Sequence, residues 1–175
     1  MSFVTGIDPG VTATGIAIFE VDSFERYDLV YIHTIKRVID WWHTAKRVAN
    51  KLEELAFKYR ATVCIEEPVM YHRVMGNRPI IQGMFVGALI SCINSSCAIN
   101  DKPNRIYLVS PTTAKLALTG KGKSSKPEMV AAAREKFDNV RWADFKIMRE
   151  KEAMADATAI ALAHIKKLNG VRRLI

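Results

Sequence analysis

The sequence predicts a single α/β domain built around one mixed sheet. Its 175 residues suffice for one compact domain and are too few for two, and its hydrophobic fraction of 49% supports a buried core. The first three segments are rich in β-branched and aromatic residues, and helical and strand-like segments then alternate. We therefore expect residues 1–175 to form one unit, with residues 170–175 as a frayed tail.

Five strands are expected, and the first three form an antiparallel meander. In order, their sequences are FVTGIDPG, VTATGIAIFEV, DLVYIHTIK, ATVCIEEPV and RIYLVSP. The first ends in a turn fixed by Pro9 and Gly10, and the fourth is stopped by Pro68.

Helical periodicity runs from Asp40 to Tyr59, and a second helix starts at Pro79. A short helix follows in PTTAKLAL, and Ser125 with Glu128 fits a capping box for a helix that runs to Phe137. The last helix is expected from Phe145 to Leu168. It is apolar almost all round, so it should be buried, with Ala159 and Ala163 allowing it to lie close against the sheet.

The charge balance is strongly basic, with 26 Lys and Arg against 18 Asp and Glu and a formal net charge of +8. Such a charge attracts polyanions, nucleic acid foremost, although a basic enzyme with a solvated surface is an alternative. The basic residues crowd into residues 115–126 and 164–173.

No apolar run has the ~18 residues of a membrane span, and the N-terminus lacks the pattern of a secretory signal. The three cysteines are odd in number and contain no CxxC pair. The sequence therefore predicts a cytoplasmic protein with no membrane association and no disulfide framework.

Carboxylates occur where buried structure is expected. Asp8 ends the first strand, Glu66 and Glu67 end the fourth, and Glu152 and Asp156 lie in the apolar last helix. Glu152 and Asp156 are four residues apart, so they share one helix face with about 5–6 Å between their Cβ atoms. Like charges at this spacing repel unless a cation lies between them or one is protonated.

Oxygen ligands without imidazole or thiolate favour Mg²⁺ or Mn²⁺, and two such ions can clamp the attacking and leaving oxygens of a phosphodiester. Asp8 is best explained as a ligand of this kind. Taken singly, each acid has another interpretation. Asp8 can be a turn residue, Glu152 can be solvated, and one of Glu66 and Glu67 should face solvent.

With these residues, the chain resembles the RuvC-type Holliday junction resolvases of the RNase H-like superfamily over nearly its whole length, as a phage or otherwise divergent member. GIDPGVTATG resembles the family's first motif with its aspartate at Asp8, CIEEPV resembles the second with its glutamate at Glu66, and DATAIALAH resembles the last with its aspartate at Asp156. The resemblance implies an RNase H-like fold, a mixed five-stranded sheet with helices on both faces.

The resemblance also implies residues that contact DNA. PTTAKLALTGKGKSSK matches a family segment whose two lysines, here Lys115 and Lys126, lie near the scissile phosphate. Lys121 and Lys123 would add affinity for the DNA backbone. Family members place an aromatic residue in the loop after the second motif, but the matching position here is Val69.

Further along the same loop are Tyr71, His72 and Arg73. We expect all three to contact DNA, with Tyr71 and His72 near enough to stack on an unpaired base. Alternatively, Tyr71 packs at the base of the loop.

The chain also departs from the family in its last motif. The usual acidic or histidine partner, three residues before the last aspartate, is Ala153 here. Glu152 lies on the same helical face as Asp156 and can replace it, as in more distant relatives.

The second helix carries Gly83 and Gly87, and in the family the corresponding helix forms a dimer interface. A twofold dimer suits a four-way junction that needs paired nicks.

These features predict a homodimeric endonuclease that resolves branched DNA by paired symmetric nicks. Two Mg²⁺ ions, or Mn²⁺, would be held by Asp8, Glu66, Asp156 and Glu152, without a nucleotide cofactor. The alternatives are a related nuclease acting on RNA or RNA–DNA hybrids and a non-catalytic junction-binding module. An actin-like ATPase fragment is disfavoured because the sequence has no second Gly-rich phosphate loop. The expected location is the cytoplasm of a bacterial or phage-infected cell.

Overall fold

The computed structural model describes residues 2–10, 12–23, 26–36, 40–59, 61–68, 78–98 and 106–172. Its elements follow in the order β1 (Ser2–Asp8), β2 (Ala13–Ser23), β3 (Arg26–Lys36), α1 (Trp41–Tyr59), β4 (Ala61–Glu66), α2 (Arg78–Ala98), β5 (Ile106–Val109), α3 (Pro111–Thr119), α4 (Lys126–Lys136), a 3₁₀ turn (Trp142–Asp144) and α5 (Met148–Arg172). This order agrees with the sequence prediction.

The five strands form one mixed sheet in the order β3-β2-β1-β4-β5. The pairs β1–β2 and β2–β3 are antiparallel, as predicted for the meander, whereas β4 and β5 run parallel to β1. Strands β1, β3, β4 and β5 therefore all end at the same edge of the sheet, which we call the carboxyl edge. Side chains that follow these strands are brought together there, although they are far apart in the sequence.

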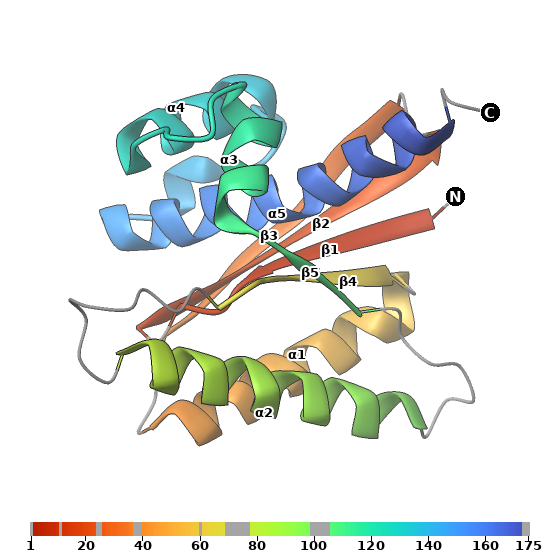
Figure 1. Ribbon diagram of the computed structural model, residues 1–175, viewed down its shortest axis with the longest axis vertical. Helices are drawn as coiled ribbons and strands as arrows, with labels where there is room; N and C mark the ends of the chain where they lie inside the picture. Colours follow the sequence, from red (N-terminus) through yellow and green to blue (C-terminus); the bar gives the residue numbers. More distant parts are fainter. Residues whose placement is uncertain are drawn as a thin grey trace.

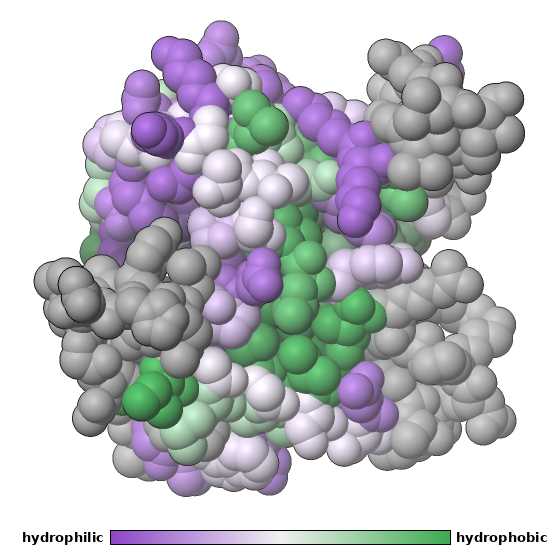
Figure 2. Space-filling model, viewed as in Figure 1, coloured by the Kyte–Doolittle hydropathy of each residue, from purple (hydrophilic) through white to green (hydrophobic). Residues whose placement is uncertain are grey.

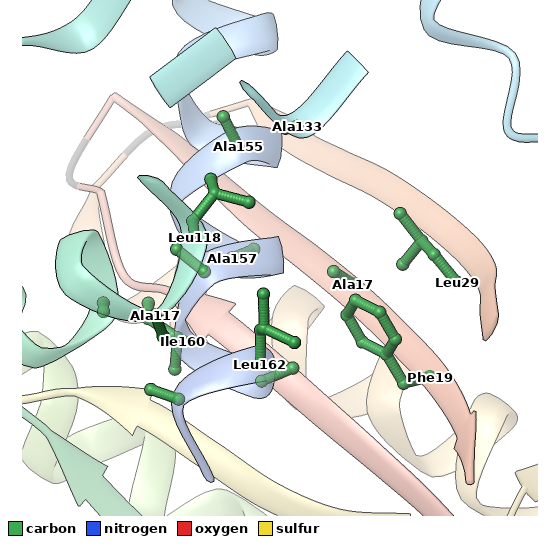
Figure 3. Packing of buried hydrophobic residues seen from close by; sticks show 14 of the residues in the cluster. Ala17, Phe19, Leu29, Ala117, Leu118, Ala133, Ala155, Ala157, Ile160 and Leu162 are labelled. Carbon is green, nitrogen blue, oxygen red and sulfur yellow. The ribbon is translucent and has the colours of Figure 1, made fainter. Parts of the chain in front are cut away.

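Helices cover both faces of the sheet, as predicted. Figure 1 shows α1 and α2 on one face and α3, α4 and α5 on the other. Each layer has its own apolar core. The side chains of β2, β3 and α3–α5 that fill one of these cores are shown in Figure 3. The other core packs Ile7, Ile16 and Ile65 of the sheet against residues of α1 and α2 such as Val48 and Phe85.

Helix α5 packs directly against the backbone of β1 and β2. A Cβ atom on Gly6 of β1 would lie 2.0 Å from the carbonyl oxygen of Ala157, and one on Gly15 of β2 would lie 2.1 Å from that of Ala153. Glycine is required at both positions because any side chain would push the helix away. The alanine-rich stretch of α5 can therefore pack closely against the sheet only because both strand positions are glycine.

The closest approach of α5 differs in detail from the sequence prediction. Ala159 and Ala163 are buried, as expected, but the atoms nearest to the sheet belong to Ala153, Ala157 and Ala161. The physical reason is that the two strand glycines, Gly6 and Gly15, lie under Ala153, Ala157 and Ala161 and not under Ala159 and Ala163.

The ends of α5 also differ from the prediction. The helix begins at Met148, not Phe145, because the chain first makes a 3₁₀ turn at Trp142–Asp144. The indole N–H of buried Trp142 donates to the carbonyl oxygen of Phe137 over 2.7 Å and holds this turn in place. The helix extends past Leu168 to Arg172, and residues 173–175 lie outside the described ranges. In those ranges, no helix is long and apolar enough to cross a membrane.

Candidate active site

Three carboxylates from distant parts of the chain lie within electrostatic range of one another at the carboxyl edge. Asp8 is the last residue of β1 and Glu66 the last of β4, and the residues just before them, Ile7 and Ile65, are partners in the parallel pairing of these strands. Asp156 lies on α5 next to Ala157, where that helix contacts Gly6. Asp156 and Glu66 both influence the ionisation of Asp8, so the three form one electrostatic cluster, which we call the acidic cluster.

The turn after β1 fixes the position of Asp8. The backbone N–H of Gly10 donates to the carbonyl oxygen of Asp8 over 2.9 Å. A Cβ atom on Gly10 would lie 2.3 Å from the carbonyl oxygen of Ala13, so a side chain does not fit. Buried Thr14 donates through its hydroxyl to the Gly10 carbonyl oxygen over 3.3 Å. The motif GIDPG is therefore a tight turn that leaves the Asp8 carboxylate at the strand end.

Lys126, the first residue of α4, forms an ion pair with Asp156 by donating from its ammonium group to the carboxylate. The helix start that presents this lysine is well fixed. The predicted capping box is present, and the Ser125 backbone N–H donates to the Glu128 carboxylate over 2.7 Å. The pairing with Asp156 joins α4 to α5 at the carboxyl edge.

The turn between α3 and α4 is held by hydroxyl groups. The hydroxyl oxygens of Thr119 and buried Ser124 lie 2.6 Å apart, and the Ser124 hydroxyl donates to the carbonyl oxygen of Lys121 over 3.0 Å. Gly120 ends α3 with a φ of 78°, a left-handed conformation that favours glycine. This turn sets where α4 begins and so where Lys126 is presented.

Burial raises the pKa of every carboxylate in the acidic cluster, and repulsion within the cluster raises it further for Asp8 and Glu66. For Asp8 the pKa lies well above its usual 3.8, chiefly because of burial and then because of Asp156 and Glu66. The pKa of Glu66 rises to about 7 through burial and the charge of Asp156. Burial also raises the pKa of Asp156, although Lys126 acts in the opposite direction. The positive charge already present does not cancel the cost of ionising the acidic cluster.

Two lysines supply that positive charge. Lys126 lowers the pKa of Asp8, Glu66 and Asp156, and Lys115 on α3 lowers the pKa of the last two. Both lysines were singled out from the sequence, and both lie within electrostatic range of the acidic cluster. The ion pair between Lys126 and Asp156 does not follow from the sequence pattern.

The remaining acidic candidates differ in their placement. Glu152 is half-buried on α5 and raises the pKa of Asp156, so it lies within range of the acidic cluster. Glu67 is exposed, and its backbone N–H donates to the carbonyl oxygen of Val109 over 2.9 Å. Neighbouring side chains at the end of a strand point to opposite sides of the sheet. The exposure of Glu67 next to Glu66 agrees with this alternation.

The other DNA-contact candidates lie in two loops. Lys121 and Lys123 are exposed in the turn between α3 and α4. Tyr71, His72 and Arg73 fall outside the described residues. Their expected contacts with DNA stay predictions.

The donor set of the acidic cluster fits a hard divalent cation, because it consists of carboxylate oxygens whose repulsion is only partly offset. Among the residues in the described ranges, no three or more His, Cys, Asp or Glu side chains are grouped closely enough to hold a metal ion. In this conformation the Lys126 ammonium is the counter-ion of the Asp156 carboxylate, and the carboxylates of the acidic cluster are not drawn together around a single point.

Comparisons with known proteins show what the chain is similar to. No family model matches the chain. The chain is 24% identical over 168 residues to the crossover junction endodeoxyribonuclease RuvC of Endomicrobium trichonymphae, and the match covers 95% of this chain and 82% of the relative.

Two solved structures are similar to this chain over almost its whole length. One is Thermus thermophilus RuvC in complex with a Holliday junction substrate, with a TM-score of 0.73, 24% identity and 97% of each chain covered. The other is the yeast mitochondrial Holliday junction resolvase Ydc2, with a TM-score of 0.68, 17% identity, and 98% of this chain and 81% of that chain covered. At these identities the structural likeness establishes the fold, and the RNase H-like prediction is confirmed.

Proposed function

Because the chain is a distant homologue of the RuvC-type Holliday junction resolvases, we propose that it is a metal-dependent endonuclease that resolves branched DNA by paired nicks. The observation that carries the proposal is the acidic cluster itself. Asp8, Glu66 and Asp156 come from three separate motifs, yet they lie within electrostatic range of one another at one edge of the sheet.

The chain's charge favours a polyanionic substrate. Its formal net charge is +8, and Lys121 and Lys123 are exposed in the turn that leads to Lys126. A relative of this fold was solved with a Holliday junction substrate, which supports a four-way junction as the DNA to test. Lysines placed next to an acidic cluster can hold a phosphate close to carboxylates that would otherwise repel it.

We assign the residues of the site as follows. Asp8, Glu66 and Asp156, with Glu152 as the fourth ligand, would hold two Mg²⁺ or Mn²⁺ ions. Such ions would lower the pKa of the attacking water and stabilise the leaving oxygen. Lys115 and Lys126 would contact the scissile phosphate, and Lys121 and Lys123 the neighbouring backbone. The tight turn at Gly10 and the contact between Gly6 and Ala157 would keep the carboxylates at a constant separation.

We further propose that the active form is a homodimer joined through α2. Among the described residues, an added Cβ atom at Gly83 or Gly87 would meet nothing within 4 Å, so packing against this part of the protomer does not explain these glycines. Ile80 and Met84 are 55% and 49% exposed on the same helix, and Leu108 on the edge strand β5 is 52% exposed. Figure 2 shows apolar residues gathered in the middle of the face where Figure 1 places β5.

A four-way-junction nicking assay in Mg²⁺, with Asp8→Asn as control, tests the proposal. We expect symmetric nicks by the wild type and a loss of cleavage by orders of magnitude in Asp8→Asn, with junction binding retained. An RNA–DNA hybrid duplex is assayed in parallel. Preferential cleavage of the hybrid would favour an RNase H-like activity, and junction binding that is equal with and without Mg²⁺, with no nick, would favour a binding module.

A further inference from the structure

The strongest feature that the proposed roles leave unexplained is the ion pair of Lys126 with Asp156. The Lys126 ammonium donates to the Asp156 carboxylate, and it also acts electrostatically on Asp8 and Glu66. It is therefore positioned to neutralise all three carboxylates of the acidic cluster. A metal ion and this ammonium cannot both occupy the same coordination position on Asp156.

The two partners are placed differently with respect to solvent. The Asp156 side chain is 10% exposed, whereas the Lys126 side chain is 51% exposed. The aspartate is fixed in the buried part of α5, but the lysine reaches it from the first turn of α4 through a flexible stem. The lysine can therefore leave toward solvent without any change in the sheet or in α5.

We propose that Lys126 is the resident counter-ion of the metal-free acidic cluster, and that a divalent cation must displace its ammonium from Asp156 in order to bind. This inference rests on the proposed function, because it takes the acidic cluster to be a metal site. The ammonium stabilises the folded protein when no metal is present and weakens its apparent metal affinity by competing for the same carboxylate. Once displaced, it is free at the edge of the site where a phosphate would approach.

Lys36 at the end of β3 provides a matched control, because it also pairs with α5. Its ammonium lies 2.9 Å from the carboxylate of Glu150 on that helix, and its side chain is 65% exposed. Lys36→Met and Lys126→Met each remove one positive charge and one ion pair with α5, but only Lys126 acts on all three carboxylates of the acidic cluster. A general effect of net charge on cation binding would appear equally in both variants.

The test is calorimetric titration of the DNA-free protein with Mg²⁺, together with thermal unfolding in EDTA and in Mg²⁺. We expect Lys126→Met to bind Mg²⁺ about two- to tenfold more tightly than the wild type, in line with the strength of a partly exposed ion pair. Its unfolding midpoint should be lower in EDTA, and the rise caused by Mg²⁺ should be larger. Lys126→Arg and Lys36→Met should bind Mg²⁺ as the wild type does.

Two results would overturn the inference. One is a Lys126→Met protein that binds Mg²⁺ no more tightly than the wild type, and the other is an equal gain in affinity in Lys36→Met. If either result is found and the wild type still nicks junctions, the proposed endonuclease function stands and the counter-ion role of Lys126 does not. If Lys126→Met shows the expected gain in Mg²⁺ affinity but the wild type nicks no junction, the counter-ion role of Lys126 stands. The proposed endonuclease function is then refuted. A wild type that binds no Mg²⁺ would refute both.

Discussion

Gly6 of β1 lies directly against Ala157 of α5, so that a Cβ atom on the glycine would be 2.0 Å from the alanine's carbonyl oxygen. Asp8 is two residues beyond Gly6, and Asp156 directly precedes Ala157. The contact between these two residues therefore sets the distance between two carboxylates of the acidic cluster. Stability and the geometry of the site depend on the same glycine.

We predict that Gly6→Ala reduces both stability and cleavage. The added methyl group would meet backbone atoms, which cannot rotate away, so α5 must shift and carry Asp156 with it. Overpacking of this kind costs about 1–3 kcal/mol of unfolding free energy, measurable by denaturant titration. Gly87→Ala is the matched control for stability alone, since an added Cβ there would meet no atom of the described residues within 4 Å, and a helical glycine replaced by alanine should gain up to about 1 kcal/mol. A Gly6→Ala protein as stable and active as the wild type would refute the argument.

Much of this arrangement could be predicted from the sequence because it follows from local patterns. Strand alternation separates Glu66 from Glu67, and the Ser125 and Glu128 spacing gives the start of α4. The closest contacts of α5 could not be predicted, because they depend on which alanine stripe lies over Gly6 and Gly15. The Lys126–Asp156 pair was missed for a related reason, since its partners are 30 residues apart and meet only when α4 docks on α5.

The raised pKa of Glu66 predicts a pH dependence of the metal-free protein. Burial and Asp156 raise this pKa from 4.5 to about 7, so between these values the folded protein holds a proton that the unfolded chain has released. The contribution of Glu66 to the free energy of unfolding is therefore fully present below pH 4.5 and is lost as the pH rises to about 7. Thermal unfolding in EDTA across this window should therefore show a less negative slope of stability against pH in Glu66→Gln than in the wild type.

The difference between the two proteins is the informative quantity in that experiment. Burial lowers the pKa of His33 and His164, and their contribution to stability changes in the opposite direction with pH. Because both proteins contain these histidines, subtraction removes their effect. Identical slopes would mean that Glu66 ionises normally and does not experience the charge of Asp156.

Gly87 allows dimerisation to be tested without disturbing the protomer. It is exposed on α2, and an added Cβ atom there would meet no atom of the described residues within 4 Å. We predict that wild type sediments as a dimer at micromolar concentration, and that Gly87→Leu shifts it toward a monomer with an unchanged circular dichroism spectrum. Paired nicking should fall with dimerisation. A monomeric wild type that still nicks both strands symmetrically would exclude this interface.

The exposed turn between α3 and α4 should contribute to salt-dependent DNA affinity. Replacing Lys121 and Lys123 with alanine should weaken junction binding and flatten the plot of log affinity against log salt, by about one unit for each phosphate that a lysine no longer neutralises. Fluorescence anisotropy at several salt concentrations measures both effects. Arg26→Ala, at the exposed start of β3 on the opposite edge of the sheet, should leave the slope unchanged. A double variant with the wild-type slope would show that this turn does not touch the backbone.

The proposed fourth metal ligand is where the chain departs from the motif pattern of the resolvases it resembles, and Glu152 and Glu67 are the two candidates for that role. Glu152 is half-buried and raises the pKa of Asp156 one helical turn away, whereas Glu67 is exposed beyond the end of β4. We predict that Glu152→Gln abolishes Mg²⁺-dependent nicking and leaves junction binding intact, and that Glu67→Gln retains most activity. Because the neutral amide no longer repels Asp156, metal-free Glu152→Gln should also be at least as stable as the wild type in thermal unfolding. If Glu67 proves essential and Glu152 dispensable, the fourth ligand comes from β4 and not from α5.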